Sequence, residues 1–212
     1  MKRTVLCLVC FLLLLSGCKM APSPEIPSDD APVTEVEVFD ESENYDIEYQ
    51  GTALIDFICA YSLQELINRS DYIVIASTDV PYSDAEQKVL NFMANPMDDF
   101  EKADLIQSYT VRPFTVKKVI KGDERETIDL CQNIIVKDNR MRVCGTEYPV
   151  WSGEEYILFL NRANGEREMY CMEATQGAFN LDFDKNIGVY GMNQTRAYEV
   201  KEYYKEYFEN NK

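Results

Sequence analysis

The chain has 212 residues, 46% of them hydrophobic, and carries a net charge of −16 with no histidine. This composition predicts a globular protein with a core rather than a disordered chain, and its negative charge argues against nucleic acids and anionic lipid headgroups as partners. The lack of histidine excludes Ser–His and Cys–His catalytic pairs, histidine-bound zinc and imidazole pH switches within this sequence.

Residues 1–17 have the composition of a secretory signal. Lys2 and Arg3 precede an unbroken apolar run of 11 residues, Val5 to Leu15. A helix that spans a bilayer needs about 20 apolar residues, so this run is too short for a permanent span. Its length and its basic flank are typical of a signal peptide.

The end of this run, Leu15-Ser16-Gly17-Cys18, resembles the lipobox of bacterial lipoprotein precursors. The resemblance implies that lipoprotein signal peptidase cuts before Cys18 and that the Cys18 thiol carries a diacylglyceryl group, with fatty acids such as palmitate. An ordinary secretory signal with an incidental cysteine is the alternative interpretation. Two or more acyl chains anchor a protein stably, so the expected location is the extracytoplasmic face of a cell membrane.

The sequence leaves the identity of that membrane open. Lys19 follows the modified cysteine, at the position where an aspartate retains lipoproteins in a Gram-negative inner membrane. The glycine-poor composition leans towards the plasma membrane of a Gram-positive cell, and an outer membrane is the alternative.

Residues 18–50 are expected to form a spacer between this anchor and a folded domain. The segment from Lys19 to Gln50 contains four prolines and ten acidic residues against a single basic residue. Like charges repel and prolines stiffen the backbone, so the segment is predicted to be extended and solvated. A docking peptide for a basic partner is the alternative, because Val33 to Phe39 alternates apolar and polar residues like an edge strand.

Residues 51–212 are predicted to form one globular, β-rich domain, which begins with helices and one strand. The capping-box pattern from Ser62 to Glu65 predicts a short helix. Tyr72 to Val80 has the composition of a buried strand. A second capping box, Ser83 to Glu86, predicts a helix that Pro96 ends.

The rest of the domain is predicted to be mostly β. Alternating apolar residues and turn signals predict strands over residues 108–120, 127–136, 140–144, 155–160, 168–173 and 178–183. At the end of the chain, an apolar stripe at helical spacing predicts a helix that packs on the sheet. The stripe consists of Val200, Tyr203, Tyr204, Tyr207 and Phe208.

Several short strands with a few helices predict a mainly β, α+β fold: a small antiparallel, OB-like barrel with N-terminal and C-terminal helices. Ser70 to Val74 (SDYIV), Val116 to Asp123 (VKKVIKGD) and Gly153 to Leu160 (GEEYILFL) resemble a class of secreted bacterial domains. That class is similar to the netrin-like OB-fold domains of metalloproteinase inhibitors. Those inhibitors place a free N-terminal cysteine on the metal of their target, whereas Cys18 is expected to be lipidated, so no inhibitory residue carries over.

Four cysteines follow the spacer: Cys59, Cys131, Cys144 and Cys171. Disulfides are permitted outside the cytoplasm, and four cysteines allow three pairings that the sequence alone does not distinguish. Cys131 and Cys144 can face each other across a hairpin, which favours that pair together with Cys59–Cys171. Buried thiols that behave as small apolar groups are the alternative.

No catalytic, cofactor-binding or metal-binding residue is predicted. Asp182 to Asn186 matches only the start of a calcium loop, because Ile187 replaces the required glycine and Asn193 replaces the last acidic ligand. A hairpin turn is therefore the preferred interpretation of this segment. Two carboxylates suffice for glycoside hydrolysis without histidine, but no pair stands out among the 37 acidic residues.

These features favour a non-enzymatic binding module, attached to a membrane through its lipid anchor, with a protein or another envelope component as partner. The alternatives are a netrin-like inhibitor of an extracytoplasmic enzyme and a carboxylate-based hydrolase. A pocket with two facing carboxylates would favour the hydrolase, and an apolar surface patch would favour a partner interface.

Overall fold

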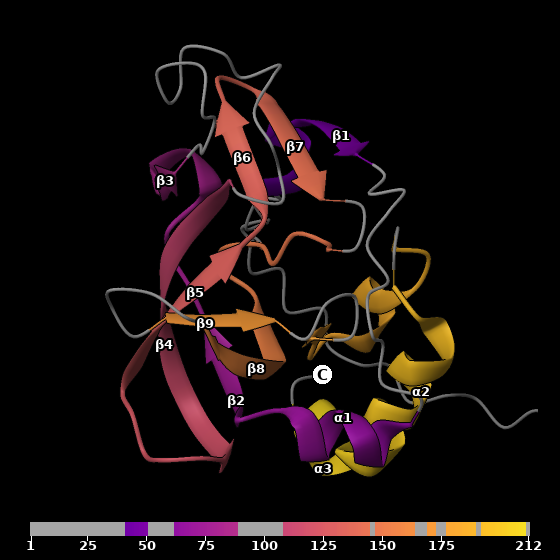
Figure 1. The fold of residues 1–212 in the computed structure, drawn as a ribbon. Coiled ribbons are helices and arrows are strands. Elements are labelled where there is room, and N and C mark those ends of the chain that lie inside the picture. Colours follow the sequence, from indigo (N-terminus) through magenta and orange to yellow (C-terminus); the bar gives the residue numbers. More distant parts are fainter. Residues whose placement is uncertain are drawn as a thin grey trace, which may run out of the picture. The chain divides into compact units, whose positions relative to one another are not determined.

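The computed structural model describes residues 41–50, 62–88, 108–144, 147–163, 169–172, 177–189 and 192–210. Within these ranges the chain forms two sheets, with helices that cover one face of the larger sheet (Figure 1). The calcium-like segment Asp182 to Asn186 and most of the predicted strands lie inside these ranges. The signal, Cys18 and residues 19–40 of the spacer lie outside the described residues.

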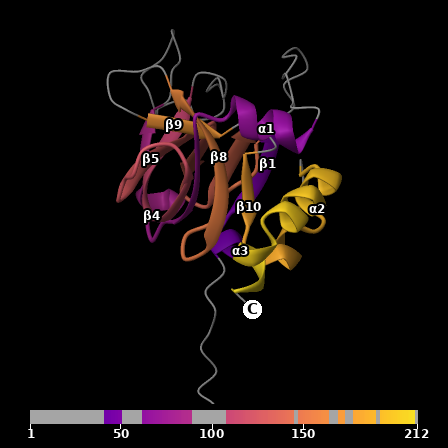
Figure 2. The ribbon, with the colours of Figure 1, turned by 90° about the horizontal axis from the view of Figure 1, so that it is seen from below.

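The larger sheet has seven strands: β2 (Tyr72–Ser77), β3 (Glu86–Lys88), β4 (Tyr109–Lys121), β5 (Thr127–Gln132), β8 (Glu155–Ala163), β9 (Met169–Met172) and β10 (Ala178–Asn180). Hydrogen bonds follow the order β10-β8-β2-β4-β5-β9, and β3 pairs with β4. Since β9 pairs with both β5 and β8, the path returns to β8 and the sheet curls (Figure 2). The pairs are antiparallel except β5–β9. The predicted mainly β, OB-like fold is confirmed.

The smaller sheet contains β1 (Asp46–Gln50), β7 (Arg140–Cys144) and β6 (Ile134–Lys137), in the order β1-β7-β6. Figure 1 shows it at the end of the molecule opposite α1 and α3. β1 runs parallel to β7, and its Ile47 and Tyr49 pack against the apolar side chains of the β6–β7 hairpin. The 3₁₀ turn η1 (Glu41–Asn44) precedes it. The structure therefore places residues 41–50 in the folded body, although the sequence was expected to continue the spacer to residue 50.

Three helices cover one face of the larger sheet: α1 (Leu63–Arg69), α2 (Gln194–Tyr203) and α3 (Lys205–Glu209). The Ser62 hydroxyl accepts a hydrogen bond from the Glu65 N–H at 3.1 Å, as its capping box predicts. We call the apolar contact between helices and sheet the helix-covered face; it contains Leu66, Ile73, Ile75, Ile157, Phe159, Val200, Tyr204 and Phe208. The predicted stripe thus packs on the sheet, except that Tyr203 is 61% exposed. Among the described residues, no helix has the length and apolar character needed to cross a bilayer.

Two local predictions were wrong. Ser83 to Glu86 does not begin a helix: a 3₁₀ turn, η2 (Tyr82–Asp84), leads into β3, where Glu86 lies opposite Val111 of β4. The open edge of β4 supplies the backbone hydrogen bonds that a helix would have made internally. Likewise, a 3₁₀ turn, η5 (Phe183–Asn186), replaces the hairpin expected around Asp182 to Asn186.

Candidate ligand-binding site

A cavity of about 260 Å³ opens beside Trp151, the single tryptophan of the sequence. Its walls come from three stretches that are distant along the chain: the η1–β1 segment, residues 148–156, and residues 180–192, which include the end of β10, η5, Val189 and Met192. A concave site assembled from several elements is the usual form of a ligand pocket. We call this cavity the Trp151 pocket.

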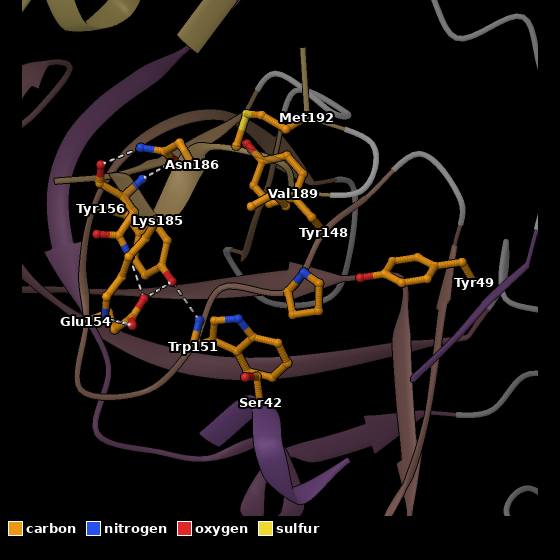
Figure 3. Close-up of a pocket in the computed structure, with 12 residues that line it drawn as sticks. Ser42, Tyr49, Tyr148, Trp151, Glu154, Tyr156, Lys185, Asn186, Val189 and Met192 are labelled. Carbon is orange, nitrogen blue, oxygen red and sulfur yellow. Dashed lines mark hydrogen bonds and ion pairs between the residues drawn. The ribbon is translucent and has the colours of Figure 1, made fainter. Parts of the chain in front are cut away.

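The two sides of the Trp151 pocket differ in chemistry (Figure 3). Aromatic and apolar side chains form one side: Tyr49, Tyr148, Pro149, Trp151, Val189 and Met192. Polar side chains form the other: Glu154, Tyr156, Asn180, Lys185 and Asn186, with Ser42 beside the tryptophan. The pocket therefore suits a ligand that has both an apolar surface and hydrogen-bonding groups.

Trp151 is held in place by neighbouring aromatic rings. Its ring stacks on Tyr45, with centroids 6.3 Å apart and 13° between the planes. Tyr82 meets it edge-on at 5.8 Å. Both arrangements are favoured by aromatic pairs, and the backbone N–H of Trp151 donates to the Tyr156 hydroxyl at 3.0 Å. The aromatic wall is therefore formed before any ligand enters.

Glu154 is the centre of the polar side. Its carboxylate accepts hydrogen bonds from the Tyr156 hydroxyl at 2.7 Å and from the Asn180 side-chain amide, and it forms an ion pair with Lys185. Burial raises the pKa of Tyr156 well above its usual value, and the nearby Glu154 charge raises it further. Tyr156 consequently remains a hydrogen-bond donor to Glu154 throughout the physiological pH range.

Asn186 fixes the strand that carries part of this polar side. Its side chain accepts from the Asn180 N–H and donates to the Asn180 carbonyl, both at 2.8 Å. These two bonds connect the end of β10 to η5, which brings Lys185 next to Glu154. The segment that resembles the start of a calcium loop thus supplies an amide and an ammonium group to the pocket.

A buried arginine supports the wall behind Trp151. Arg112 of β4 is 1% exposed, and its guanidinium lies 3.5 Å from the centroid of the Tyr82 ring. It donates to the Val80 and Val150 carbonyls and, at 3.1 Å, to the Gln132 side-chain oxygen. We call Arg112, Tyr82, Gln132 and these two carbonyls the Arg112 network. Satisfied hydrogen bonds and a cation–π contact compensate the desolvation of the charge, and they fix Val150, the residue before Trp151.

Glu41 joins the start of the folded body to the same wall. Its carboxylate is buried, with the residue 2% exposed. One oxygen accepts from the Tyr82 N–H at 2.7 Å, and the other accepts from the Ser152 N–H at 2.8 Å. Hydrogen bonds to an ionised group are stronger than neutral ones, so this acid of the predicted spacer anchors η1 beside the pocket.

Glu147 lies next to the pocket wall in sequence. It precedes Tyr148, and its carboxylate accepts a hydrogen bond from the Asn133 N–H at 2.9 Å. Burial raises the pKa of Glu147 to about 7, although the Asn133 hydrogen bond acts in the opposite direction. This segment therefore changes its charge near neutral pH.

Cys131 and Cys144, two of the cysteines predicted as site residues, do not lie in the pocket lining. Cys18 and Cys59 lie outside the described residues. Cys131 is in β5 of the larger sheet, and Cys144 ends β7 of the smaller one. In the parallel β5–β9 pair, Cys131 is the register partner of Cys171. The hairpin that leads to Cys144 is formed by β6 and β7, and the disulfide pairing stays a prediction.

The described residues hold no group of three or more His, Cys, Asp or Glu side chains arranged to bind a metal ion. Among the described residues that line the Trp151 pocket, Glu154 is the one carboxylate. Hydrolysis by paired acids needs two carboxyl groups about 5 to 9.5 Å apart. The described lining therefore offers one carboxyl group.

Sequence reasoning missed the pocket residues. No role was predicted for Trp151, and Lys185 was placed only in a calcium-like motif. The one usable signal was the lone tryptophan beside Ser152-Gly153, since large aromatic side chains on turns are frequent in binding sites. Nothing in the sequence connects that turn with Lys185, because their contact depends on β8–β10 pairing.

No family model, curated protein or solved structure matches this chain. The resemblance of its strand motifs to netrin-like domains therefore stays a prediction.

Proposed function

We propose that this protein is a lipid-anchored binding module on the extracytoplasmic face of a bacterial membrane, which holds a small ligand in the Trp151 pocket. The observation that carries the binding role is the preformed pocket, with an aromatic wall on one side and the Glu154–Lys185 pair on the other. The lipobox ending at Cys18 supports the location. The proposed role is non-enzymatic, and the ligand belongs to the cell envelope or its surroundings.

The buried support behind the pocket favours binding. Binding sites gain affinity when their walls are already in place, because less conformational entropy is lost on association. Trp151 is held by Tyr45 and Tyr82, and the backbone on either side of it is held by Arg112 and Glu41. A netrin-like inhibitor would instead need an inhibitory residue, and the resemblance supplies none.

The anchor is tested by replacing the lipidated residue. Cys18→Ser should release the protein from the membrane fraction and abolish its labelling by a palmitate analogue, since the acyl chains provide the attachment. Cys10→Ser, within the apolar run of the signal, is the matched control and should leave both properties unchanged. A Cys18→Ser protein that stays membrane-bound and labelled would refute the location.

The pocket is tested by intrinsic fluorescence, because Trp151 is the single tryptophan. The lipidated protein, in a detergent without sugar headgroups, is titrated with a low-molecular-mass digest of the cell envelope. We expect a saturable change in emission. Val189→Phe, which fills the pocket, should abolish it, whereas Ile187→Phe should not, because Ile187 is 47% exposed and outside the lining. An equal response from both variants would contradict the proposal.

A further inference from the structure

The charges on the polar side of the Trp151 pocket balance one another. Glu154 and Lys185 form an ion pair there, and the Glu154 side chain is 19% exposed. An anionic ligand would meet the Glu154 carboxylate and a chain of net charge −16. A cationic ligand would meet the Lys185 ammonium. Because like charges repel strongly where water is partly excluded, this pair favours a neutral ligand.

The same pair requires a ligand that both donates and accepts hydrogen bonds. A carboxylate offers about four acceptor positions and an ammonium three donor protons. Three of the Glu154 positions are taken by Tyr156, Asn180 and Lys185. The Lys185 side chain is 45% exposed and thus accessible from the pocket mouth. Hydroxyl groups, which donate and accept at once, match this combination of acceptor and donor.

The opposite wall requires an apolar surface on the same ligand. Trp151 and Val189 face the polar side chains across the cavity (Figure 3), and Pro149 lines the same cavity. A sugar ring meets both requirements, since its C–H face packs on an aromatic ring and its hydroxyl groups lie around its edge. A purely apolar ligand would leave the polar side without partners, which costs binding free energy.

The volume limits the part of the ligand that enters. The cavity of about 260 Å³ is smaller than the roughly 300 to 1,000 Å³ of pockets that enclose drug-sized molecules. It therefore accommodates one compact unit, and the remainder of a longer chain must lie outside.

We infer that the Trp151 pocket holds one neutral sugar unit of an envelope or environmental glycan, with its C–H face on Trp151 and its hydroxyl groups on Glu154 and Lys185. This inference rests on the proposed function and names its ligand class. It makes the balance between the two charges, rather than either charge alone, the basis of selectivity.

The test compares monosaccharides that differ in charge, and adds neutral trisaccharides. Trp151 emission is followed while the lipidated protein is titrated with N-acetylglucosamine, glucosamine and glucuronic acid, and with the neutral trisaccharides maltotriose, cellotriose and triacetylchitotriose. We expect at least one neutral sugar to bind saturably, and N-acetylglucosamine to bind at least about fivefold more tightly than either charged monosaccharide.

Two variants shift the charge balance in opposite directions. Glu154→Gln should move the preference towards glucuronic acid, and Lys185→Gln should move it towards glucosamine, each by about fivefold or more. Glu155→Gln is the matched control, because Glu155 pairs with Lys117 and does not line the pocket. The sugar preference of this variant should remain that of the unmodified protein. Circular dichroism of each variant confirms that it is folded.

The outcomes separate this inference from the proposed function. If no neutral sugar binds, or if a charged sugar binds most tightly, the saccharide inference is overturned. The binding role still stands in that case, provided that the envelope digest changes Trp151 emission and Val189→Phe abolishes the change. If the digest has no effect that depends on Val189, the proposed function itself fails.

Discussion

The helix-covered face and the Arg112 network are both buried, but different interactions hold them together. On the helix-covered face, apolar side chains pack without strict orientation, and Phe159 meets Phe179 and Tyr204 edge-on at 5.9 and 6.1 Å. In the Arg112 network, a charged side chain is fixed by directional bonds to Val80, Val150 and Gln132. The first region mainly contributes stability. The second also determines where the pocket wall lies.

The largest loss of stability is expected from the helix-covered face. Phe159→Ala removes a fully buried ring and should lower the free energy of unfolding by about 3 to 5 kcal/mol. Urea denaturation measures this change. The emission maximum of Trp151 in the folded variant should not move. Phe159 belongs to the helix-covered face, whereas Trp151 packs against the apolar cluster of the β6–β7 hairpin. If the variant does not fold, Phe159→Leu makes the same comparison, and a shifted emission maximum would contradict the separation of the two regions.

A somewhat smaller loss, with a different consequence, is expected from the Arg112 network. Arg112→Met leaves the Val80 carbonyl, the buried Val150 carbonyl and the Gln132 oxygen without a charged donor, which should cost about 3 kcal/mol. Unlike Phe159→Ala, it should also shift the Trp151 emission and weaken ligand binding, because Val150 loses its hydrogen bond from the guanidinium. Arg162→Met, at an exposed arginine, is the control and should change stability by less than about 0.5 kcal/mol. Unchanged Trp151 emission in folded Arg112→Met would show that the network does not position the wall.

The difference between these regions also explains how much of the fold the sequence predicted. Strands and helices with a continuous apolar run or regular apolar spacing were found, among them β2, β7 and the C-terminal helices α2 and α3, which supply Val200 and Phe208. Their burial follows from the apolar pattern, which is a local property of the sequence. The fold class followed from counting such elements.

Elements determined by pairing with distant strands were not predicted. Ser83 to Glu86 has the residues of a helix cap, yet Glu86 pairs with Val111 in the edge strand β3. β1 lies in an acidic, proline-containing stretch, and only its parallel pairing with β7 makes it a strand. In both cases, tertiary hydrogen bonds outweighed the local preference.

The candidate site was the least predictable part. Its polar side joins Glu154 to Lys185, and its wall depends on Glu41, whose carboxylate reaches Ser152 across the fold. No periodicity relates these residues, since each contact depends on the register of separate strands. A buried charge such as Arg112 also contradicts the usual expectation that arginine lies at the surface.

The smallest predicted effect concerns pH, and it again separates the two regions. On the helix-covered face, burial raises the pKa of Tyr204 to about 12, so this group does not titrate near neutrality. Beside the pocket wall, burial raises the pKa of Glu147 to about 7 from its ordinary value of 4.5. Between these two pH values the folded protein binds a proton that the unfolded chain does not. The Glu147 contribution therefore lowers the free energy of unfolding as the pH rises from about 4.5 to 7.

Glu147→Gln should remove this contribution, because the amide stays neutral at every pH and still offers an oxygen to the Asn133 N–H. The full pKa shift would correspond to about 3.4 kcal/mol, but Glu147 is only partly buried, so at pH 8 the variant should be more stable than the unmodified protein by about 2 kcal/mol. At pH 4.5 the two should be nearly equal. Urea denaturation at both pH values measures the difference, with Glu155→Gln as an exposed control that should show none. A stability difference that is the same at both pH values would mean that the Glu147 carboxyl is as well solvated in the folded protein as in the unfolded chain. Glu147 would then not titrate near neutral pH.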